Sequence, residues 1–293
     1  MSHKTPLDRA LTRAALRAKI ANWRNEGLSV GFVPTMGALH DGHLSLVSIA
    51  RKKADRVVAS IFVNPTQFAP GEDFDTYPRT EEEDCAKLAS VGCDLVYLPQ
   101  VEEMYPDGSV TNVRVEELSD LLDGGPRPHF FYGVATVVAR LFLHVQPDFA
   151  VFGEKDYQQL QIIRRMVRDL GFPIDIIGGS TFRDPDGLAQ SSRNAYLKPN
   201  ERPIAGAMQA ALHRLCRRLE AGANREEAIA EAHGFLLKSG FDKVDYVTAV
   251  DPATLEALTG ETVAPDFIGR VLGAGWVGET RLIDNMGFER PTN

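Results

Sequence analysis

The chain has 293 residues, of which 44% are hydrophobic and 25% are charged, as in an ordinary soluble globular protein. Its formal net charge of -8 argues against extensive contact with the phosphate backbone of DNA or RNA. No apolar run approaches the roughly 18 residues that span a bilayer. Residues 1–19 carry mixed charge without the apolar core of a signal peptide. The three cysteines form no CxxC pair, and this favours location of the protein in the reducing cytoplasm.

The first half of the chain alternates between predicted helices and predicted strands. Apolar residues recur at helical spacing over residues 7–26, and Gly27 is a typical helix stop. Short apolar runs then alternate with amphipathic segments, which is typical of buried parallel strands joined by crossover helices. Strands are predicted over 29–33, 56–63, 94–98, 149–152 and 174–177, and helices over 44–54, 80–91, 132–145 and 156–170. This order indicates an α/β fold with a doubly wound, Rossmann-like parallel sheet.

The pattern changes at about residue 182. A polar loop rich in Asp, Pro, Ser and Asn covers residues 183–200. Helices are then predicted over 201–220 and 225–239, and strands over 243–250, 269–272 and 280–283. We therefore expect a Rossmann-like domain over residues 1–181 and a smaller C-terminal α+β domain over residues 182–293.

A glycine-rich turn with two histidines, here called the His turn, joins the strand at 29–33 to its helix. Residues 34–43 read Pro-Thr-Met-Gly-Ala-Leu-His-Asp-Gly-His, so His40 and His43 stand where a helix begins. A helix N-terminus offers backbone N–H groups and a positive dipole end, and Gly37 and Gly42 allow close approach of a ligand. Two imidazoles there suit the stabilisation of charge during phosphate displacement. A pair of surface histidines and part of a metal site are the alternatives.

Polar residues also follow the next predicted strand, at the edge where doubly wound sheets bind ligands. Asn64 and Gln67 lie in the segment Asn-Pro-Thr-Gln-Phe at 64–68. Their amides suit a ligand that carries hydroxyl and carboxylate groups. The alternative is that these amides only satisfy the backbone of a loop stiffened by Pro65, and the sequence leaves both interpretations open.

A third polar cluster follows the strand predicted at 149–152. Gly153 opens a helix within the segment Gly-Glu-Lys-Asp-Tyr-Gln-Gln at 153–159. Lys155 is placed to meet a phosphate as a point charge, and Gln159 lies three residues beyond Asp156 on the same helical face. Alternatively, Asp156 is only a helix cap and Lys155 is a solvated side chain.

Two further segments carry groups suited to phosphate chemistry. Ser191, Ser192 and Arg193 offer two hydroxyls and a guanidinium to a triphosphate, unless their loop is an exposed linker. Four acidic residues begin the helix that follows the capping-box pattern at Thr80, and they complement the helix dipole. Asp84, the last of the four, is in addition a candidate ligand for Mg²⁺ delivered with ATP.

These segments together resemble the pantothenate synthetase family, the pantoate–β-alanine ligases of the HxGH nucleotidyltransferase superfamily. The His turn alone would indicate only the superfamily, whereas the segments at 62–68 and 152–160 single out the family. The matching segments are PTMGALHDGH at 34–43, FVNPTQF at 62–68, YPRT at 77–80, FGEKDYQQL at 152–160, DGLAQSSRN at 186–194 and TRLIDN at 280–285. They span nearly the whole chain.

The resemblance implies a two-step ligation. (R)-Pantoate attacks the α-phosphate of ATP to give pantoyl adenylate and pyrophosphate, and the amine of β-alanine then displaces AMP to form pantothenate. ATP, as a substrate, and Mg²⁺ are the implied cofactors, and a cytoplasmic homodimer is the implied form, although a monomer is compatible with the sequence. The domain over 1–181 would bind nucleotide and pantoate, and the domain over 182–293 would act as a lid.

The resemblance also implies catalytic and nucleotide-binding residues. His43 and His40 match the signature histidines, and Lys155 joins them as a catalytic residue. His43 is the residue usually labelled the proton donor, although stabilisation of transition-state charge describes its physics better. The implied ATP site comprises Met36, Gly37, Ala38, Leu39, His40, Asp41, Gly42, His43, Gly153, Glu154, Lys155, Asp156, Phe182, Gln190, Ser191, Ser192 and Arg193.

The implied substrate and metal residues lie after other strands. Gln67 and Gln159 match the pantoate-binding glutamines, and Gln67 also borders the β-alanine site. Asn64 joins them as a substrate-binding residue on the strength of its place in the loop. Asp84 matches a position associated with Mg²⁺.

Three departures from the family pattern stand out. Gln190 replaces the usual Met, and Phe182 replaces a Val beside the adenine. Residues 127–131 read Arg-Pro-His-Phe-Phe in place of Arg-Pro-Gly-His-Phe, so Phe130 stands at the expected histidine and His129 falls one residue early. These changes concern adenine packing and one contact near the phosphates, and they leave the signature histidines and glutamines intact.

Two other functions compete with the ligase. Another HxGH nucleotidyltransferase would transfer a nucleotide to a phosphorylated acceptor or activate an amino acid for tRNA charging. The acidic balance and the lack of an RNA-binding appendage weigh against the tRNA version. A non-catalytic nucleotide sensor would bind ATP without turnover, but the presence of His40, His43 and Lys155 weighs against it.

Overall fold

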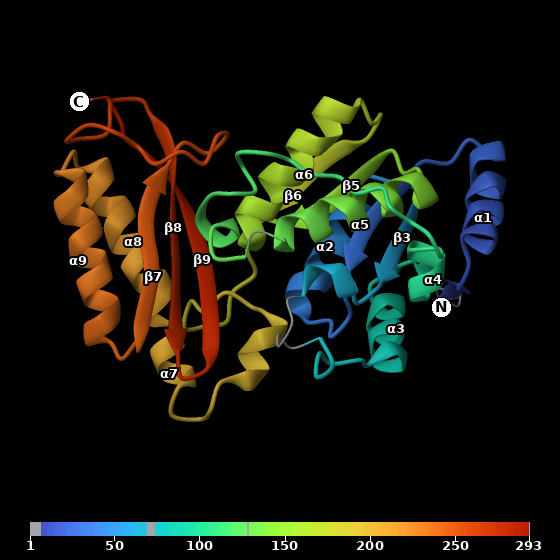
Figure 1. The fold of residues 1–293 in the computed structure, drawn as a ribbon, viewed down its shortest axis with the longest axis horizontal. Coiled ribbons are helices and arrows are strands. Elements are labelled where there is room, and N and C mark those ends of the chain that lie inside the picture. The colour runs from blue at the N-terminus through green and yellow to red at the C-terminus, as the bar shows by residue number, and fades with distance from the viewer. Residues whose placement is uncertain (1–6, 69–73, 128, 293) are drawn as a thin grey trace. The chain divides into compact units, whose positions relative to one another are not determined.

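The computed structural model describes residues 7–68, 74–127 and 129–292, and the chain divides into two compact units (Figure 1). The first unit comprises residues 1–154 and 158–180, and the second comprises residues 155–157 and 181–293. Two parts of segments discussed above lie outside the described residues, namely residues 1–6 and Pro128.

A parallel sheet forms the centre of the first unit. Its strands are β1 (Asp8–Ala10), β2 (Val30–Thr35), β3 (Arg56–Ile61), β4 (Leu95–Tyr97), β5 (Phe149–Gly153) and β6 (Asp175–Gly179). The order β1-β4-β3-β2-β5-β6 runs outward from β2 in both directions, which confirms the predicted doubly wound fold. The carboxyl ends of β2 and β5 therefore form the topological switch point, where such sheets bind ligands.

Helices cover both faces of this sheet. They are α1 (Arg13–Asn25), α2 (Asp41–Arg51), α3 (Glu81–Ser90), α4 (Val101–Met104), α5 (Phe130–Val145) and α6 (Tyr157–Leu170), with 3-10 turns η1 (Pro65–Gln67), η2 (Leu122–Gly124) and η3 (Glu154–Asp156). Successive side chains of β2 point to opposite faces. Val33 packs with Val47 of α2 and Leu88 of α3, whereas the ring of Phe32 contacts that of Phe142 in α5, with centroids 6.4 Å apart.

The start of the chain differs from its prediction. Helical spacing predicts a helix from residue 7, but residues 8–10 form β1, which pairs in parallel with β4. Thr12 then caps α1, because its Oγ1 accepts a hydrogen bond from the backbone N–H of Ala15 at 3.2 Å. Three residues are too few to show a strand period, so pairing with β4 decides their conformation.

The helix after β2 begins earlier than predicted. The spacing of apolar residues predicts a start at residue 44, whereas α2 begins at Asp41, directly after His40 as its N-cap residue. His43 therefore lies in the first turn of the helix. The polar residues of this turn carry no apolar period, which is why periodicity alone places the start too late.

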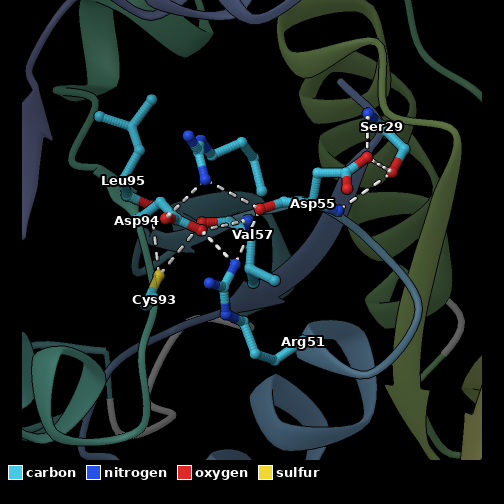
Figure 2. Close-up of polar contacts among 8 residues, drawn as sticks. Ser29, Arg51, Asp55, Val57, Cys93, Asp94 and Leu95 are labelled. Atoms are coloured by element: carbon cyan, nitrogen blue, oxygen red, sulfur yellow. Dashed lines mark hydrogen bonds and ion pairs between the residues drawn. The ribbon is translucent and has the colours of Figure 1, made fainter. Parts of the chain in front are cut away.

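Polar side chains tie the amino ends of β2, β3 and β4 together, and we call Ser29, Arg51, Asp55 and Asp94 the amino-edge cluster (Figure 2). Asp55 Oδ2 accepts hydrogen bonds from the Ser29 hydroxyl at 2.6 Å and from the Ser29 backbone N–H at 2.9 Å. Asp94 Oδ2 accepts from the Val57 N–H at 2.8 Å and from Arg51 Nη1 at 3.2 Å. The same Arg51 nitrogen donates to the Asp55 carbonyl at 2.8 Å, which joins the two carboxylate sites.

The second unit has a small antiparallel sheet of its own, as predicted. It contains α7 (Arg202–Ala205), α8 (Ala207–Glu220), α9 (Arg225–Lys238), β7 (Lys243–Val250), β8 (Ile268–Val277), β9 (Thr280–Glu289) and the 3-10 turn η4 (Ser192–Tyr196). The strand order is β7-β8-β9, and α8 and α9 lie on one face of the sheet (Figure 1). Met208, Leu212 and Leu236 of these helices pack with Val247 and Val271 of the strands to form its core.

Strands β8 and β9 are longer than predicted. Residues 269–272 and 280–283 show strand character in sequence, but the ladder continues to Val277 and Glu289. The Gly-Ala-Gly run at 273–275 hides this continuation, because glycine disfavours strands. A Cβ atom at Gly273 would lie 2.9 Å from the Met208 sulfur, so glycine is needed there for α8 to pack closely.

None of the helices in the described part of the chain is long and apolar enough to cross a membrane. Cys85, Cys93 and Cys216 are free thiols, and all three are buried. Their burial indicates that these side chains serve packing.

Candidate active site

The His turn leaves the carboxyl end of β2 in an unusual backbone conformation. Gly37 and Ala38 have φ angles of 88° and 50°, both in the left-handed region. This region suits glycine and strains alanine. A Cβ atom at Gly37 would also lie 3.1 Å from Asp84 Oδ2, so space as well as conformation favours glycine there.

The turn brings the two histidines into contact. The ring centroids of His40 and His43 lie 4.1 Å apart, and the His40 backbone N–H donates to His43 Nδ1 at 3.4 Å. A nitrogen that accepts this bond is unprotonated, so the neutral His43 ring carries its proton on Nε2. The turn thus fixes the tautomer that offers an N–H donor from Nε2.

The backbone N–H groups between Gly37 and Leu39 are engaged within the first unit. Gly37 donates to Thr35 Oγ1 at 3.3 Å, and Ala38 and Leu39 donate to Asp84 Oδ2 and Oδ1, each at 2.8 Å. We expected ligand contacts from N–H groups at the helix N-terminus, and those of residues 37–39, which precede it, are used within the protein instead.

Asp84 lies in the first turn of α3 and is completely buried. Besides the two backbone N–H groups of the His turn, it accepts a hydrogen bond from Thr80 Oγ1 at 3.1 Å. The predicted capping box at Thr80 is therefore wrong, since the hydroxyl turns to Asp84 and the structure records no cap bond from it to the helix backbone. The Asp84 carboxylate instead links the start of α3 to the His turn.

Asn64 and Gln67 follow β3 and are 1% and 7% exposed. Asn64 Nδ2 donates to Gln67 Oε1 at 2.9 Å and to the Gly133 carbonyl at 3.2 Å. Asn64 Oδ1 accepts from the hydroxyls of Tyr105 at 2.8 Å and Thr66 at 3.0 Å. Both ends of the Asn64 amide are thus used within the protein, mainly by side chains and by the Gly133 carbonyl of α5 rather than by the backbone of its own loop.

The bond from Asn64 also orients Gln67. Because Gln67 Oε1 accepts from Asn64, its Nε2 is the end of the amide that offers donors beyond this loop. Gly133 of α5 permits the arrangement, since a Cβ atom there would lie 2.4 Å from the Thr66 carbonyl oxygen. The loop packs against α5 at Gly133, and the bond from Asn64 fixes the direction of the Gln67 Nε2 group.

Neighbouring glutamines of α6 have different surroundings. Gln158 is buried and donates to the carbonyls of Leu118 and Leu121 at 2.8 and 2.7 Å, while its Oε1 accepts from the Asp123 N–H at 3.1 Å. It therefore holds the segment at 118–123. Gln159 is only partly buried, which leaves it the better candidate for a ligand.

Residues 155–157 belong to the second unit and contact strands β8 and β9 of its sheet. Asn285 of β9 donates to the Lys155 carbonyl at 2.9 Å, and the Arg270 guanidinium lies 3.7 Å from the Tyr157 ring centroid. Lys155 Nζ pairs with Asp156 at 3.2 Å. The short segment thus has a fixed backbone, while Gly153 and Glu154 belong to the first unit.

The segment at 182–194 is an ordered hairpin rather than a linker. The Gln190 N–H donates to the Phe182 carbonyl at 2.9 Å, and Arg183 bridges to Ala189 in an isolated β-bridge. Arg183 also forms a two-pronged ion pair with the buried carboxylate of Asp284, at 2.6 and 2.9 Å. The interpretation as an exposed linker is therefore wrong.

Gln190, which departs from the family pattern, has a specific partner. Its Nε2 donates to Asp184 Oδ1 at 2.8 Å, and Asp184 also pairs with Arg202 at 2.8 Å. Arg202 bonds Asp186 as well, and this hydrogen bond lowers the pKa of the Asp186 carboxyl. A methionine could not join this network, so Gln190 adds a polar tie to the hairpin.

Three of the predicted phosphate ligands of this unit lie at the end of the hairpin segment. Ser191 caps η4, since its Oγ accepts from the Arg193 N–H at 3.3 Å, and Ser192 and Arg193 lie in the first turn of η4. Phe182 is 42% exposed, so its ring presents an apolar face. Hydroxyls, a guanidinium and an aromatic ring thus occur together at one end of the hairpin.

The third departure lies at the start of α5. Phe130 is the first residue of the helix, and the Arg127 guanidinium lies 4.1 Å from its ring centroid. Its ring also contacts that of Phe131 at 4.9 Å between centroids. Phe130 therefore fills its position by packing, and it offers no donor there.

The structure gives each unit a share of the predicted site. The first unit contains the His turn, Asn64, Gln67, Asp84, Gly153, Glu154 and Gln159, and the second contains Lys155, Asp156, Phe182, Gln190, Ser191, Ser192 and Arg193. Sequence reasoning missed three structural side chains: Lys87 donates to the Leu39 carbonyl of the His turn at 2.8 Å, Tyr105 donates to Asn64, and Gln158 holds the segment at 118–123. A polar residue at an otherwise buried helical position was the available signal for Gln158.

Comparison with known proteins identifies close relatives. Residues 9–287 match the family model of pantoate-beta-alanine ligase. A pantothenate synthetase from Hyphomonas neptunium is 67% identical over 288 residues, which cover 98% of each chain. The crystal structure of pantothenate synthetase from Thermus thermophilus superposes with a TM-score of 0.87 at 49% identity, covering 96% of this chain and 99% of that one.

A second solved structure carries ligands. The pantoate-beta-alanine ligase from Francisella tularensis, in complex with beta-gamma ATP and beta-alanine, superposes with a TM-score of 0.78 at 34% identity. The match covers 96% of this chain and 97% of that one.

Proposed function

Because the chain belongs to the pantoate–β-alanine ligase family, and so joins pantoate to β-alanine, we propose that it drives this ligation with ATP through a pantoyl adenylate. A carboxylate oxygen of (R)-pantoate attacks the α-phosphorus of ATP, and the bond to the leaving pyrophosphate breaks. The β-alanine nitrogen then attacks the acyl carbon, loses a proton and expels AMP. The amide product is pantothenate.

The contact between His40 and His43 is the observation that carries this proposal. Their rings lie 4.1 Å apart at the N-terminus of α2, beside the topological switch point of the sheet. The Nε2–H of His43 is a donor for an α-phosphate oxygen, where negative charge grows in the first step. The helix dipole adds to this stabilisation, because α2 presents its positive end.

ATP as the second substrate is supported by the Francisella tularensis relative, which was crystallised with beta-gamma ATP. In this chain we assign the nucleotide to the residues of the predicted ATP site, from Met36 to His43 and Gly153 to Asp156, together with Phe182 and Gln190 to Arg193. Lys155 and Arg193 supply positive charge to the phosphates. The apolar face of Phe182 suits the adenine.

We assign pantoate to Gln67 and Gln159. Pantoate carries two hydroxyls and a carboxylate, so it needs several donors, and the Gln67 Nε2 group is aimed by the bond from Asn64. Asn64 acts through Gln67 rather than on the ligand, because its own amide is used by Thr66, Tyr105 and Gly133. We assign β-alanine, the amine of the second step, to a position beside Gln67, and the Francisella tularensis complex with beta-alanine supports it as a substrate.

Mg²⁺ is expected as the partner of the triphosphate, and it would supply positive charge there. The described residues contain no cluster of three or more His, Cys, Asp and Glu side chains that could hold a metal ion. Asp84 does not fit the role either, since it is fully buried and bonded to the His turn. A cytoplasmic homodimer and a lid role for residues 182–293 stay predictions.

The test is to incubate the purified chain with ATP, Mg²⁺ and pantoate, first without and then with β-alanine, and to identify the products by mass spectrometry. We expect pyrophosphate and pantoyl adenylate from ATP and pantoate, and AMP and pantothenate once β-alanine is added. Turnover with a different acceptor would favour another nucleotidyltransferase. ATP binding without any product would favour a sensor.

A further inference from the structure

Two side chains of helix α3 form hydrogen bonds with the backbone of the His turn. Asp84 accepts hydrogen bonds from the N–H groups of Ala38 and Leu39, both at 2.8 Å. One helical turn further on, Lys87 Nζ donates to the carbonyl of Leu39, also at 2.8 Å. A carboxylate and an ammonium from one helix thus hold both polar groups of the Leu39 backbone.

The bonds of Asp84 disagree with a role in binding Mg²⁺. The ion is bound through one or two carboxylates and keeps several of its waters, so a ligand oxygen must be reachable by water. Asp84 is 0% exposed, and its Oδ2 already serves Ala38 and Thr80. The two oxygens are instead matched to two successive backbone donors, which is the arrangement expected of a structural anchor.

The anchored backbone is one that the chain would not adopt unaided. Ala38 has a φ of 50°, a left-handed conformation that disfavours alanine, and Gly37 precedes it with a φ of 88°. Two charge-assisted bonds at and after the strained residue offset its cost. The next residue is His40, so the geometry of the first signature histidine depends on this anchor.

We propose that Asp84 is a positioning residue that sets the His turn in its working conformation before any ligand binds. This inference rests on the proposed function for its kinetic consequence, whereas the anchor itself can be tested by hydrogen exchange without any ligand. Fixing the turn in advance keeps His40 and His43 in the geometry that stabilises charge in the transition state. Lys87 supports the same conformation from the carbonyl side.

The first test is hydrogen exchange in the absence of ATP and Mg²⁺. Asp84→Asn keeps the size of the side chain but replaces one acceptor oxygen with an N–H₂ group, which faces a backbone N–H. We expect exchange in the peptide that covers residues 34–43 to become at least about tenfold faster, because a buried charge-assisted bond is lost. Glu81→Gln removes the same charge from the same helix at an exposed position, and it should leave this peptide unchanged.

The second test separates an anchor from a metal ligand. In the steady state we expect Asp84→Asn to lower kcat about tenfold or more, with the Mg²⁺ concentration for half-maximal rate unchanged. Recovery of the rate at high Mg²⁺ or Mn²⁺, or normal exchange at 34–43, would overturn the proposal. If wild-type chain formed no pantothenate, the proposed function would fail while the exchange result would still decide the anchor.

A milder variant guards against a failure to fold. Lys87→Met removes only the bond to the Leu39 carbonyl and the surface ion pair with Glu83. It should give a smaller increase in exchange over residues 34–43, with circular dichroism and thermal unfolding close to wild type. Unchanged exchange in a folded Lys87→Met chain would contradict a role for the Lys87 hydrogen bond in holding the His turn.

Discussion

The two edges of the parallel sheet use polar side chains in opposite ways. At the amino edge, Asp94 Oδ2 accepts from the Val57 N–H and from Arg51, so this carboxylate links neighbouring strands (Figure 2). At the carboxyl edge, His43 and Gln67 are each held at one end by a neighbour, through Nδ1 and Oε1. Asp94 thus stabilises the pairing of strands, whereas the bonds to His43 and Gln67 orient side chains that are candidates for binding a ligand.

The largest effect is expected at the carboxyl edge. His43→Ala should lower kcat at least about a hundredfold, or about 2.7 kcal/mol, since it removes a preorganised donor to the transition state. Its urea midpoint should stay close to wild type, because the ring is only partly buried. Single-turnover formation of the adenylate measures the effect. A near-normal rate would contradict the role assigned to His43.

The amino edge should respond in stability instead. Asp94→Ala leaves the Val57 N–H without its acceptor and takes a partner from Arg51, which should lower the free energy of unfolding by about 2 kcal/mol. Urea denaturation measures this loss. The kcat of the folded variant should equal that of wild type, and a loss of kcat greater than about threefold would break the contrast between the edges.

Asn64 tests whether one side chain can orient another. Asn64→Ala removes the donor to Gln67 Oε1, so the pantoate KM should rise about tenfold, or about 1.4 kcal/mol, as the Gln67 amide loses its direction. The KM for ATP should change much less. Tyr105→Phe removes only a hydroxyl bond to Asn64 Oδ1 and should raise the pantoate KM by a smaller factor. Equal effects on both substrates would indicate general loosening.

The smallest effect concerns acid stability. Hydrogen bonds from the Ser29 hydroxyl and backbone lower the pKa of the Asp55 carboxyl below its ordinary value of 3.8. A lowered pKa stabilises the fold above the ordinary pKa, and the contribution is lost as pH falls through the folded value. Ser29→Ala should therefore be less stable than wild type at pH 7, with the difference shrinking below about pH 4. Urea unfolding at both pH values checks the sign.

The layered fold followed from local pattern, because buried parallel strands are continuous apolar runs. Runs such as Val57–Ala59 mark these strands without knowledge of their partners. The strand at 8–10 could not be predicted, since three residues show no period and only pairing with β4 makes them a strand. Glycines 273 and 275 hid the length of β8 for a related reason, as the demand for glycine comes from side chains packed above the sheet.

The candidate site was predictable where chemistry and chain position coincide. His40 and His43 lie beside each other in sequence and in space. Asp84 was also predicted to belong to the site, but as a metal ligand. The sequence does not show that its carboxylate accepts hydrogen bonds from Ala38 and Leu39, which lie more than forty residues earlier in the chain. The same holds for the Asn64 amide, whose partners come from three separate segments.

The burial of the cysteines has a practical consequence. Burial raises the pKa of the Cys93 and Cys216 thiols to about 12, and it also raises that of Cys85. Thiols in this state are poor nucleophiles and slow to oxidise. The folded protein thus has a surface that is chemically silent toward maleimides, so a single cysteine introduced near the His turn would carry a fluorescent label without background from the native thiols.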